Sequence, residues 1–196
     1  ISTVTATSVS NPDISATCTV TVTDEYAPLT TGWILPMGEE YAWTMKFQHY
    51  ELADSTKPVI DANGKEWSES EYDDATWGTL TGPIGTESGC NHIWQGQDNC
   101  YFLRRSFILP ELGMGSIQFH AIHDDSIRVY INGHAIIDHG YDMGWHSCII
   151  PADSLVIGEN VLAIYAQQNG GGAYLDYGLY FEEVPSYDIV VNSEGN

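Results

Sequence analysis

Apolar and polar residues alternate with a period of two along most of this chain. Ile117, Phe119 and Ala121 alternate with Gln118 and His120. The same period occurs in three further segments, SIRVYI, NVLAIYAQQ and YLDYGLYFEEV. Because successive side chains of a strand point to opposite faces of a sheet, this pattern predicts strands with one buried face.

The predicted strands are short, and they follow one another at roughly ten-residue spacing with turn residues between them. Helical periodicity is hard to find, and the segment ELADSTKPVIDANGKEW is broken by Pro58 and by the Asn63–Gly64 pair. Many short strands in this arrangement are typical of an antiparallel sandwich. The pattern therefore predicts an all-β domain. The sequence has no apolar run long enough to predict a transmembrane helix.

The segment SIRVYINGHAIID predicts a β-hairpin. Its Asn132–Gly133 pair tolerates positive φ, which a two-residue type I′ turn requires, and apolar residues alternate on both sides. Asp124 and Asp125 then precede the first strand, and Asp138 ends the second. An Asp pair at such a position commonly accepts hydrogen bonds from backbone N–H groups of a turn. A cation site that uses Asp124 or Asp125 is the alternative.

Residues 1–25 differ in composition from the rest of the chain. Ser, Thr and Val alternate in STVTATSV and ATCTVTVTD, and the NPD between them is a turn signal, so we expect a β-hairpin. A hairpin of such small residues cannot bury a core alone. The stretch resembles the last two strands of a bacterial immunoglobulin-like domain, which implies that it is the end of a neighbouring domain or a linker.

Four motifs in residues 26–185 resemble galactose-binding-like jelly-roll domains. The first motif, GKEWSESEYDDATWGTLTGPIG, has a Trp followed by a DDxxW turn and a Gly-rich segment, and the second, YFLRRSFILPEL, is a strand with an aromatic residue, an Arg and a Phe. The third, HDDSIRVYINGHAII, has an Asp-Asp pair before an Asn-Gly hairpin. The fourth, IGENVLAIYAQQNGGGAYLDYGLYFE, forms the closing strands. The resemblance implies an antiparallel jelly-roll β-sandwich, followed by a tail or linker in residues 186–196.

The resemblance also carries implications for function. Domains of this kind are attached to secreted bacterial glycosidases, including β-galactosidase-type enzymes, and to other surface proteins. Many bind carbohydrate, and many others serve only as scaffolding. The resemblance therefore implies a secreted or cell-surface bacterial protein, and it implies the fold more strongly than any binding activity.

Most motif residues have structural roles in that family. The resemblance implies that Trp67 and Trp77 pack at the edge of the sandwich and that the Asp73–Asp74 pair caps the turn before Trp77. It also implies that Arg104 or Arg105 reaches an acidic neighbour. The insert ESGCNHIWQGQDNC departs from the simpler Gly-rich loop of the family.

Acidic residues outnumber basic residues by 27 to 6, and the formal net charge is -21. Few cations are available to displace counterions from phosphates, so nucleic acid and anionic membranes are poor partners. The expected partners are a glycan or polysaccharide and other domains of the same polypeptide, without membrane insertion. The chain begins at Ile1 and shows no signal peptide, so we expect a piece of a longer or processed protein.

The abundant carboxylates could supply a cation site. Hard cations prefer carboxylate and carbonyl oxygens, and related jelly rolls often hold a structural calcium ion. Asp124 and Asp125 are the candidate ligands, although no EF-hand-like spacing is present. His139 and His146 stand in no recognised metal spacing. We therefore expect either no cofactor or a structural calcium ion.

Cysteines occur at four positions, which permit three complete pairings. Cys90 and Cys100 flank one loop and are the expected disulfide pair, with buried free thiols as the alternative. No CxxC is present, so a zinc knuckle is not expected.

Three loops combine aromatic side chains with amides, carboxylates or histidines. Sugars bind through apolar C–H faces stacked on aromatic rings, with planar polar side chains contacting the hydroxyls, and binding on a packed sandwich is expected in its loops. The loops span residues 91–99, 138–147 and 167–174. Tryptophans such as Trp94 and Trp145 are more often partly buried anchors than sugar platforms, and this is the alternative interpretation of both. The candidate ligand-binding residues are His92, Trp94, Gln97, Asn99, Tyr141, Trp145, His146, Gln168, Asn169 and Tyr174.

Catalysis is not expected. No nucleophile elbow, phosphate-binding loop, dinucleotide fingerprint or HExxH is present, and no carboxylate pair stands in a recognisable catalytic motif. The sequence therefore favours a non-catalytic carbohydrate-binding module of an exported multidomain protein. A spacer or adhesion domain without sugar affinity is the main alternative. An accessory domain that contributes to a glycoside hydrolase active site is the third.

Overall fold

The computed structural model describes residues 2–7, 15–20, 29–38, 40–57, 59–110, 115–139 and 143–183. Almost every element in this part of the chain is a strand. The elements are β1 (Ser2–Thr7), β2 (Ser15–Val20), β3 (Gly32–Leu35), β4 (Trp43–Glu51), β5 (Gly78–Gly82), β6 (Ile84–Gly85), β7 (His92–Ile93), β8 (Asn99–Leu109), β9 (Gly115–Asp124), β10 (Ser126–Ile131), β11 (His134–His139), β12 (Gly144–Ile149), the 3-10 turn η1 (Ala152–Ser154), β13 (Gly158–Gln168) and β14 (Tyr174–Glu183). None of the described segments forms a helix that could cross a membrane.

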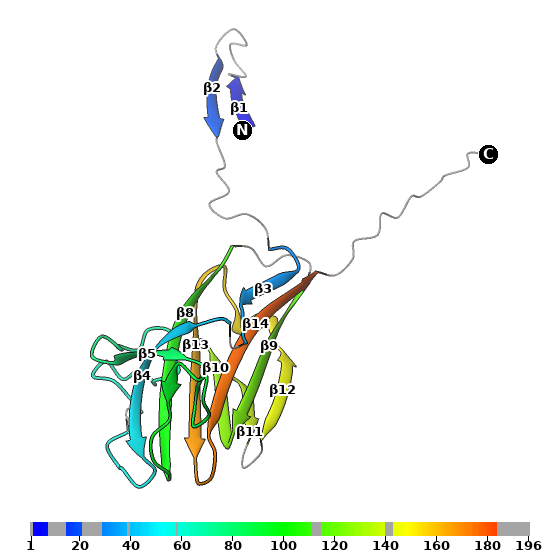
Figure 1. The fold of residues 1–196 in the computed structure, drawn as a ribbon. Coiled ribbons are helices and arrows are strands. Elements are labelled where there is room, and N and C mark those ends of the chain that lie inside the picture. The colour runs from blue at the N-terminus through cyan, green and yellow to red at the C-terminus, as the bar shows by residue number, and fades with distance from the viewer. Residues whose placement is uncertain are drawn as a thin grey trace, which may run out of the picture.

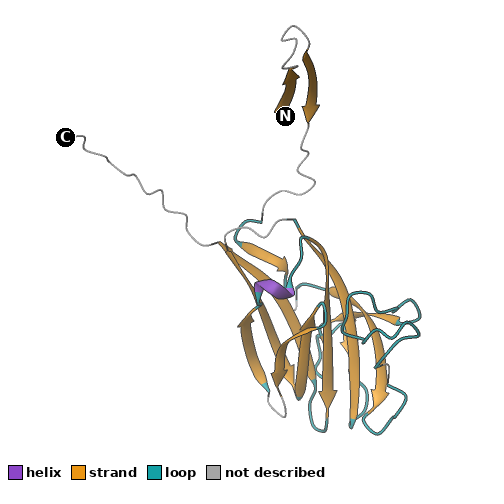
Figure 2. Ribbon diagram, turned by 180° about the vertical axis from the view of Figure 1, so that it is seen from behind, coloured by secondary structure: helices purple, strands orange, loops and turns teal. Residues whose placement is uncertain are grey.

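The strands from β3 onward form two sheets that face each other (Figure 1). The first sheet has the order β11-β10-β13-β8-β4-β5, and the second has the order β12-β9-β14-β6-β7, with β3 also paired to β14. Figure 2 shows the same two layers from behind, with η1 as the single short helical turn drawn. Only the short β6–β7 pair is parallel among the described strands. The predicted all-β antiparallel sandwich is confirmed.

Alternate residues of each strand fill the space between the two sheets. In β9, Ile117, Phe119 and Ala121 are buried, whereas Gln118 and His120 lie on the outer face. The inward side chains of both sheets form one continuous apolar cluster. Period-two burial is therefore the main source of the core, as the sequence pattern predicts.

The β10–β11 hairpin has the predicted turn. Asn132 and Gly133 have φ values of 51° and 86°, as a type I′ turn requires. The Asn132 side chain also ties this turn to β13, because its Oδ1 accepts the Val161 N–H at 2.8 Å and its Nδ2 donates to Asn160 Oδ1 at 2.9 Å. The hairpin is thus fixed both by its own backbone and by the neighbouring strand.

The connection between β4 and β5 covers part of the outer face of the first sheet. Trp67, Tyr72 and Trp77 pack there against Phe102 and Cys100 of β8 in a second apolar cluster. Trp67 and Trp77 therefore pack as implied, but the predicted location at the edge of the sandwich is wrong, because both lie on the outer face over the interior strand β8.

Arg104 is buried beneath this connection, with 3% of its surface exposed. Its Nε donates to Asp74 Oδ2 at 2.9 Å, and its Nη1 donates to the backbone oxygens of Trp67 and Glu69. Asp73 Oδ1 accepts the Ala75 N–H at 3.0 Å. Arg104 is therefore the arginine that reaches an acidic neighbour. Asp73 caps the turn as implied, but the Asp74 side chain binds Arg104 instead of capping.

The predicted Cys90–Cys100 disulfide is wrong, because Cys100 is a buried free thiol. Cys100 lies on the outer face of the first sheet among the aromatic residues of the second cluster. The Cys90 Sγ instead lies beside Gly85 of the second sheet. Although the two cysteines flank one loop, its ends diverge to different sheets. Burial raises the pKa of the Cys100 thiol and keeps it protonated.

At the N-terminus, β1 and β2 form an antiparallel pair from Ser2↔Val20 to Thr7↔Ser15, which confirms the predicted hairpin. Its NPD turn lies outside the described residues, as does the predicted tail at 186–196. The immunoglobulin-like origin of the hairpin and the three domain boundaries stay predictions.

Candidate functional site

The described parts of the three predicted binding loops lie at the same end of the sandwich. The register pairs Asn99 at the start of β8 with Gln168 at the end of β13, and Asp124 at the end of β9 with Tyr174 at the start of β14. Gly144 at the start of β12 pairs with His123, next to the same end. In Figure 1 this end is at the bottom, and we call it the loop end.

The first loop is held from within by its own aromatic residue. Trp94 is only 2% exposed, its Nε1–H donates to Asn99 Oδ1 at 2.7 Å, and its ring packs against Tyr101 with centroids 4.8 Å apart. Asn99 is also buried and donates to the Gln95 backbone oxygen. Neither Trp94 nor Asn99 offers a surface to a ligand. Of the two interpretations of Trp94, the structure supports the anchor.

His92 and Gln97 occupy different positions in the same loop. His92 is half-buried, with its Nε2 at 3.2 Å from the Tyr101 hydroxyl oxygen. Burial lowers the pKa of His92, so its ring is neutral at pH 7. Gln97 is exposed, and its Oε1 lies 4.0 Å from the position that a Cβ would take on Gly170. The first and third loops therefore lie against each other.

The third loop is also stabilised by its own amides. Gln168 is buried and its Nε2 donates to the Gly171 backbone oxygen at 3.1 Å. Asn169 and Tyr174 are half-buried, and Asn169 Oδ1 accepts from Gln167 Nε2 at 2.7 Å. Gln168 is thus a structural residue, whereas Asn169 and Tyr174 remain at the surface.

The Asp124–Asp125 pair lies under the third loop. Asp125 is buried, and its Oδ2 accepts the Asn169 N–H at 2.6 Å. The predicted capping role is therefore right for Asp125, but the donor comes from a loop distant in sequence. Asp124 is half-buried near Gly172. Within the described ranges no group of three or more His, Cys, Asp or Glu side chains is placed to hold a metal ion, and calcium at this pair stays a prediction.

Burial, followed by the charge of Asp125, raises the pKa of Asp124. The folded state then holds the Asp124 proton more tightly than the unfolded state does. The associated stabilisation is present below the ordinary pKa of an aspartate and is lost as the pH rises through the folded-state value. We expect Asp124→Asn to be more stable than wild type at pH 7, with the difference closing in acid. Urea unfolding of both proteins across this pH range measures the effect, and a difference independent of pH would contradict it.

The second loop contributes one prominent surface residue. Trp145 lies on β12 and is 56% exposed, whereas His146 is half-buried and packs against His123 with centroids 4.7 Å apart. Asp138 forms an exposed ion pair with Arg128 at 3.0 Å. Tyr141 lies outside the described residues.

Trp145 belongs to a row of rings on the outer face of the second sheet. His120 of β9 lies between Trp145, at 5.5 Å, and Trp33 of β3, at 5.6 Å, and Trp33 contacts Tyr180 of β14 at 5.3 Å between centroids. Trp33 is 44% exposed. We call Trp33, His120, Trp145 and Tyr180 the aromatic row. It crosses four strands, and it contains both of the tryptophans that are exposed among the described residues.

The strand register explains how the row forms. Trp145 pairs with Ile122 and Ser147 pairs with His120, so the outward side chains of β12 and β9 lie side by side. Gly178 of β14 leaves room for Trp33, because a Cβ at this position would approach the Trp33 ring to 2.6 Å. The alternation of residues 117–121 predicts that His120 points outward, but Trp33, His120 and Tyr180 were not among the predicted site residues. The outward position of His120 in the alternating pattern was the one sequence signal that pointed to this face.

Polar groups accompany the row. Gln118 Nε2 donates to Glu182 Oε2 at 2.8 Å on the same outer face. His120 Nδ1 is buried without a hydrogen-bond partner, and burial lowers the pKa of His120. His120 is therefore neutral at pH 7. The face combines exposed indole rings with an amide, a carboxylate and a neutral imidazole.

No protein-family model matches the chain, and no curated protein matches it. Solved structures of glycosidases are similar to this chain over part of their length. A glycosyl hydrolase family 2 member from Bacteroides cellulosilyticus DSM 14838 is 14% identical; the match covers 72% of this chain and 21% of that one, with a TM-score of 0.48. A β-glucuronidase of Bifidobacterium dentium, complexed with coumarin-3-O-glucuronide, is 15% identical. The match covers 71% of this chain and 21% of that one, with a TM-score of 0.49.

β-Glucuronidase 2 of Bacteroides uniformis is 19% identical, with 73% of this chain and 18% of that chain covered and a TM-score of 0.48. The chain thus spans about a fifth of the length of these enzymes. At these identities the likeness is one of fold alone.

Proposed function

We propose that this protein is a non-catalytic carbohydrate-binding module and that its glycan stacks on the aromatic row. The observation that carries the proposal is the exposure of two tryptophans, Trp33 and Trp145, on one face of one sheet. The wider setting that we propose is an exported bacterial multidomain protein with a galactose-binding-like fold. Calcium at Asp124 and Asp125 would be structural.

The physical case rests on desolvation. An exposed indole ring presents an apolar face, and a sugar ring presents a matching face of C–H groups, so stacking removes both from water. The remaining hydroxyls need polar partners, and Gln118 and Glu182 supply donors and acceptors beside the rings. A few oriented polar groups among aromatic side chains are typical of ligand sites.

A contact with another domain of the same polypeptide is the second candidate. Ile122 and Ile149 are exposed on the same outer face, at 36% and 66%. Exposed aliphatic side chains beside tryptophans are also typical of protein interfaces. This candidate corresponds to a spacer or to an accessory domain of a glycosidase, and it predicts no affinity for free glycans.

The test is a glycan array followed by calorimetric titration of the tightest-binding oligosaccharide. Trp145→Ala and Trp33→Ala are each expected to weaken binding at least about tenfold, because each removes one stacking face. Both side chains are exposed, so we expect circular dichroism and thermal unfolding to stay close to wild type.

Ile157→Ala is the matched control, because Ile157 is 64% exposed and lies outside the aromatic row. It should leave the affinity unchanged. If the Trp33 and Trp145 variants bind as wild type does, the aromatic row is not the site. If no glycan on the array binds, the domain-contact candidate replaces carbohydrate recognition.

A further inference from the structure

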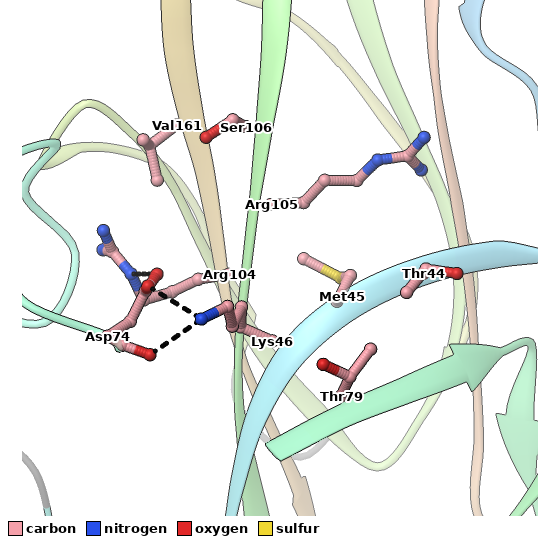
Figure 3. Close-up of a pocket in the computed structure, with 9 residues that line it drawn as sticks. All are labelled: Thr44, Met45, Lys46, Asp74, Thr79, Arg104, Arg105, Ser106 and Val161. Atoms are coloured by element: carbon pink, nitrogen blue, oxygen red, sulfur yellow. Dashed lines mark hydrogen bonds and ion pairs between the residues drawn. The ribbon is translucent and has the colours of Figure 1, made fainter. Parts of the chain in front are cut away.

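A pocket opens on the first sheet, between β4 and β8 (Figure 3). Its volume is about 340 Å³, within the range of small-molecule sites. The aromatic row lies on the outer face of the opposite sheet, so the two features are separate. The pocket is lined by Thr44, Met45, Lys46, Asp74, Thr79, Arg104, Arg105, Ser106 and Val161.

The pocket exists because two strands separate. β4 and β8 pair from Glu51↔Asn99 to Lys46↔Arg104, and the pairing then stops. Beyond this point β4 continues along β5, whereas β8 continues along β13. Figure 3 shows β4 curving away from β8 over the lining residues. The facing strand edges beyond Lys46 and Arg104 are thus left without a ladder between them.

The pocket concentrates positive charge in an otherwise acidic protein. Lys46, Arg104 and Arg105 are three of only six Lys and Arg residues in the chain. Asp74 is the one carboxylate among the lining residues, and it binds both Arg104 and Lys46. Figure 3 shows these three groups together on one side of the pocket, while Arg105 extends away from them.

Arg105 has no ion-pair partner within the described part of the chain. Its Nη1 donates to the Tyr177 hydroxyl oxygen at 3.3 Å, its one side-chain hydrogen bond among the described residues. Tyr177 is fully buried, and burial raises its pKa to about 12, so it stays neutral and does not compensate Arg105. A half-buried guanidinium carries five N–H donors, most of which are unused here.

We propose that this pocket binds a carboxylated sugar, a uronate, with Arg105 pairing to the carboxylate. A planar guanidinium matches a carboxylate in a two-bond geometry. Thr44, Thr79 and Ser106 supply hydroxyl groups around the same space, which suits the hydroxyls of a sugar ring. The surrounding negative charge disfavours anions elsewhere on the surface, so the pocket is the preferred place for one.

The experiment is an NMR titration of the whole chain, labelled at methionine methyl groups, with D-glucuronate, D-glucose and acetate in parallel. Met45 lines the pocket and is buried, so its methyl resonance reports local binding. We expect glucuronate to shift this resonance and to bind at least about tenfold more tightly than glucose or acetate. Arg105→Gln should weaken glucuronate about tenfold or more, and Arg105→Lys should weaken it less.

Arg128→Gln is the matched control, because it removes the same charge from an exposed side chain outside this pocket. It should leave the glucuronate affinity within about twofold of wild type. Equal affinity for glucose would refute the carboxylate contact, and equal affinity for acetate would refute the sugar contacts. An unchanged affinity in Arg105→Gln would overturn the assignment. The Trp33 and Trp145 variants should not alter this titration, so failure here is distinct from failure of the aromatic row.

Discussion

Replacing Arg104 by alanine is expected to lower the free energy of unfolding by about 3–5 kcal/mol. The side chain is 3% exposed and ties β8 to the connection between β4 and β5, through Asp74 and through the backbone oxygens of Trp67 and Glu69. Its loss leaves the Trp67 backbone oxygen without its donor beneath the connection between β4 and β5. Urea unfolding followed by circular dichroism measures the change.

Arg128→Ala serves as the control for this prediction. Its ion pair with Asp138 has similar geometry, with Nε and Oδ1 3.0 Å apart, but both side chains are mostly exposed. Exposed pairs of this kind contribute at most about 1 kcal/mol. If the two variants lose similar stability, the connection between β4 and β5 does not depend on the buried pair.

Most of the sandwich was predictable because its strands bury one face each. In such a strand the hydrophobic pattern alone identifies the inward residues, as it did for Ile117, Phe119 and Ala121 of β9. The Asn132–Gly133 turn was predictable for a different reason, since few residue pairs adopt its φ values. Both signals are local, and neither needs knowledge of the strand order.

The aromatic row was not predictable in the same way. Periodicity shows that His120 points outward, but it does not show that Trp145 and Trp33 become its neighbours. That depends on β12 and β14 flanking β9, a long-range arrangement. Trp33 lies in a strand too short to show alternation, and the space that it occupies depends on Gly178.

For the loops, the sequence predicted the segments but not the orientation of their side chains. The strand register places them at one end of the sandwich, as a binding site shared by the loops would require. Loop composition, however, does not reveal which way a side chain turns. Trp94 turns inward because Asn99 accepts its N–H. Cys90 and Cys100 diverge because the loop between them ends on two sheets.

Trp94→Ala is expected to cost about 3–5 kcal/mol of unfolding free energy, the usual range for emptying a buried tryptophan site. Trp94 packs against Tyr101 and donates to Asn99, so the variant loses apolar contacts and leaves a buried amide oxygen without its donor. Chemical denaturation monitored by circular dichroism measures the loss. Trp94→Phe keeps most of the packing and should retain a larger share of the stability.

Trp145→Ala provides the contrast that separates an anchor from a binding residue. Its exposed ring predicts a small change in stability and a large change in glycan affinity, the reverse of the Trp94 pattern. Trp94→Phe, which stays folded, should bind glycan as wild type does. Were Trp94→Phe to lose affinity while keeping its stability, the loop end would have to be part of the glycan site. The row on the outer face of the second sheet would then be insufficient to explain recognition.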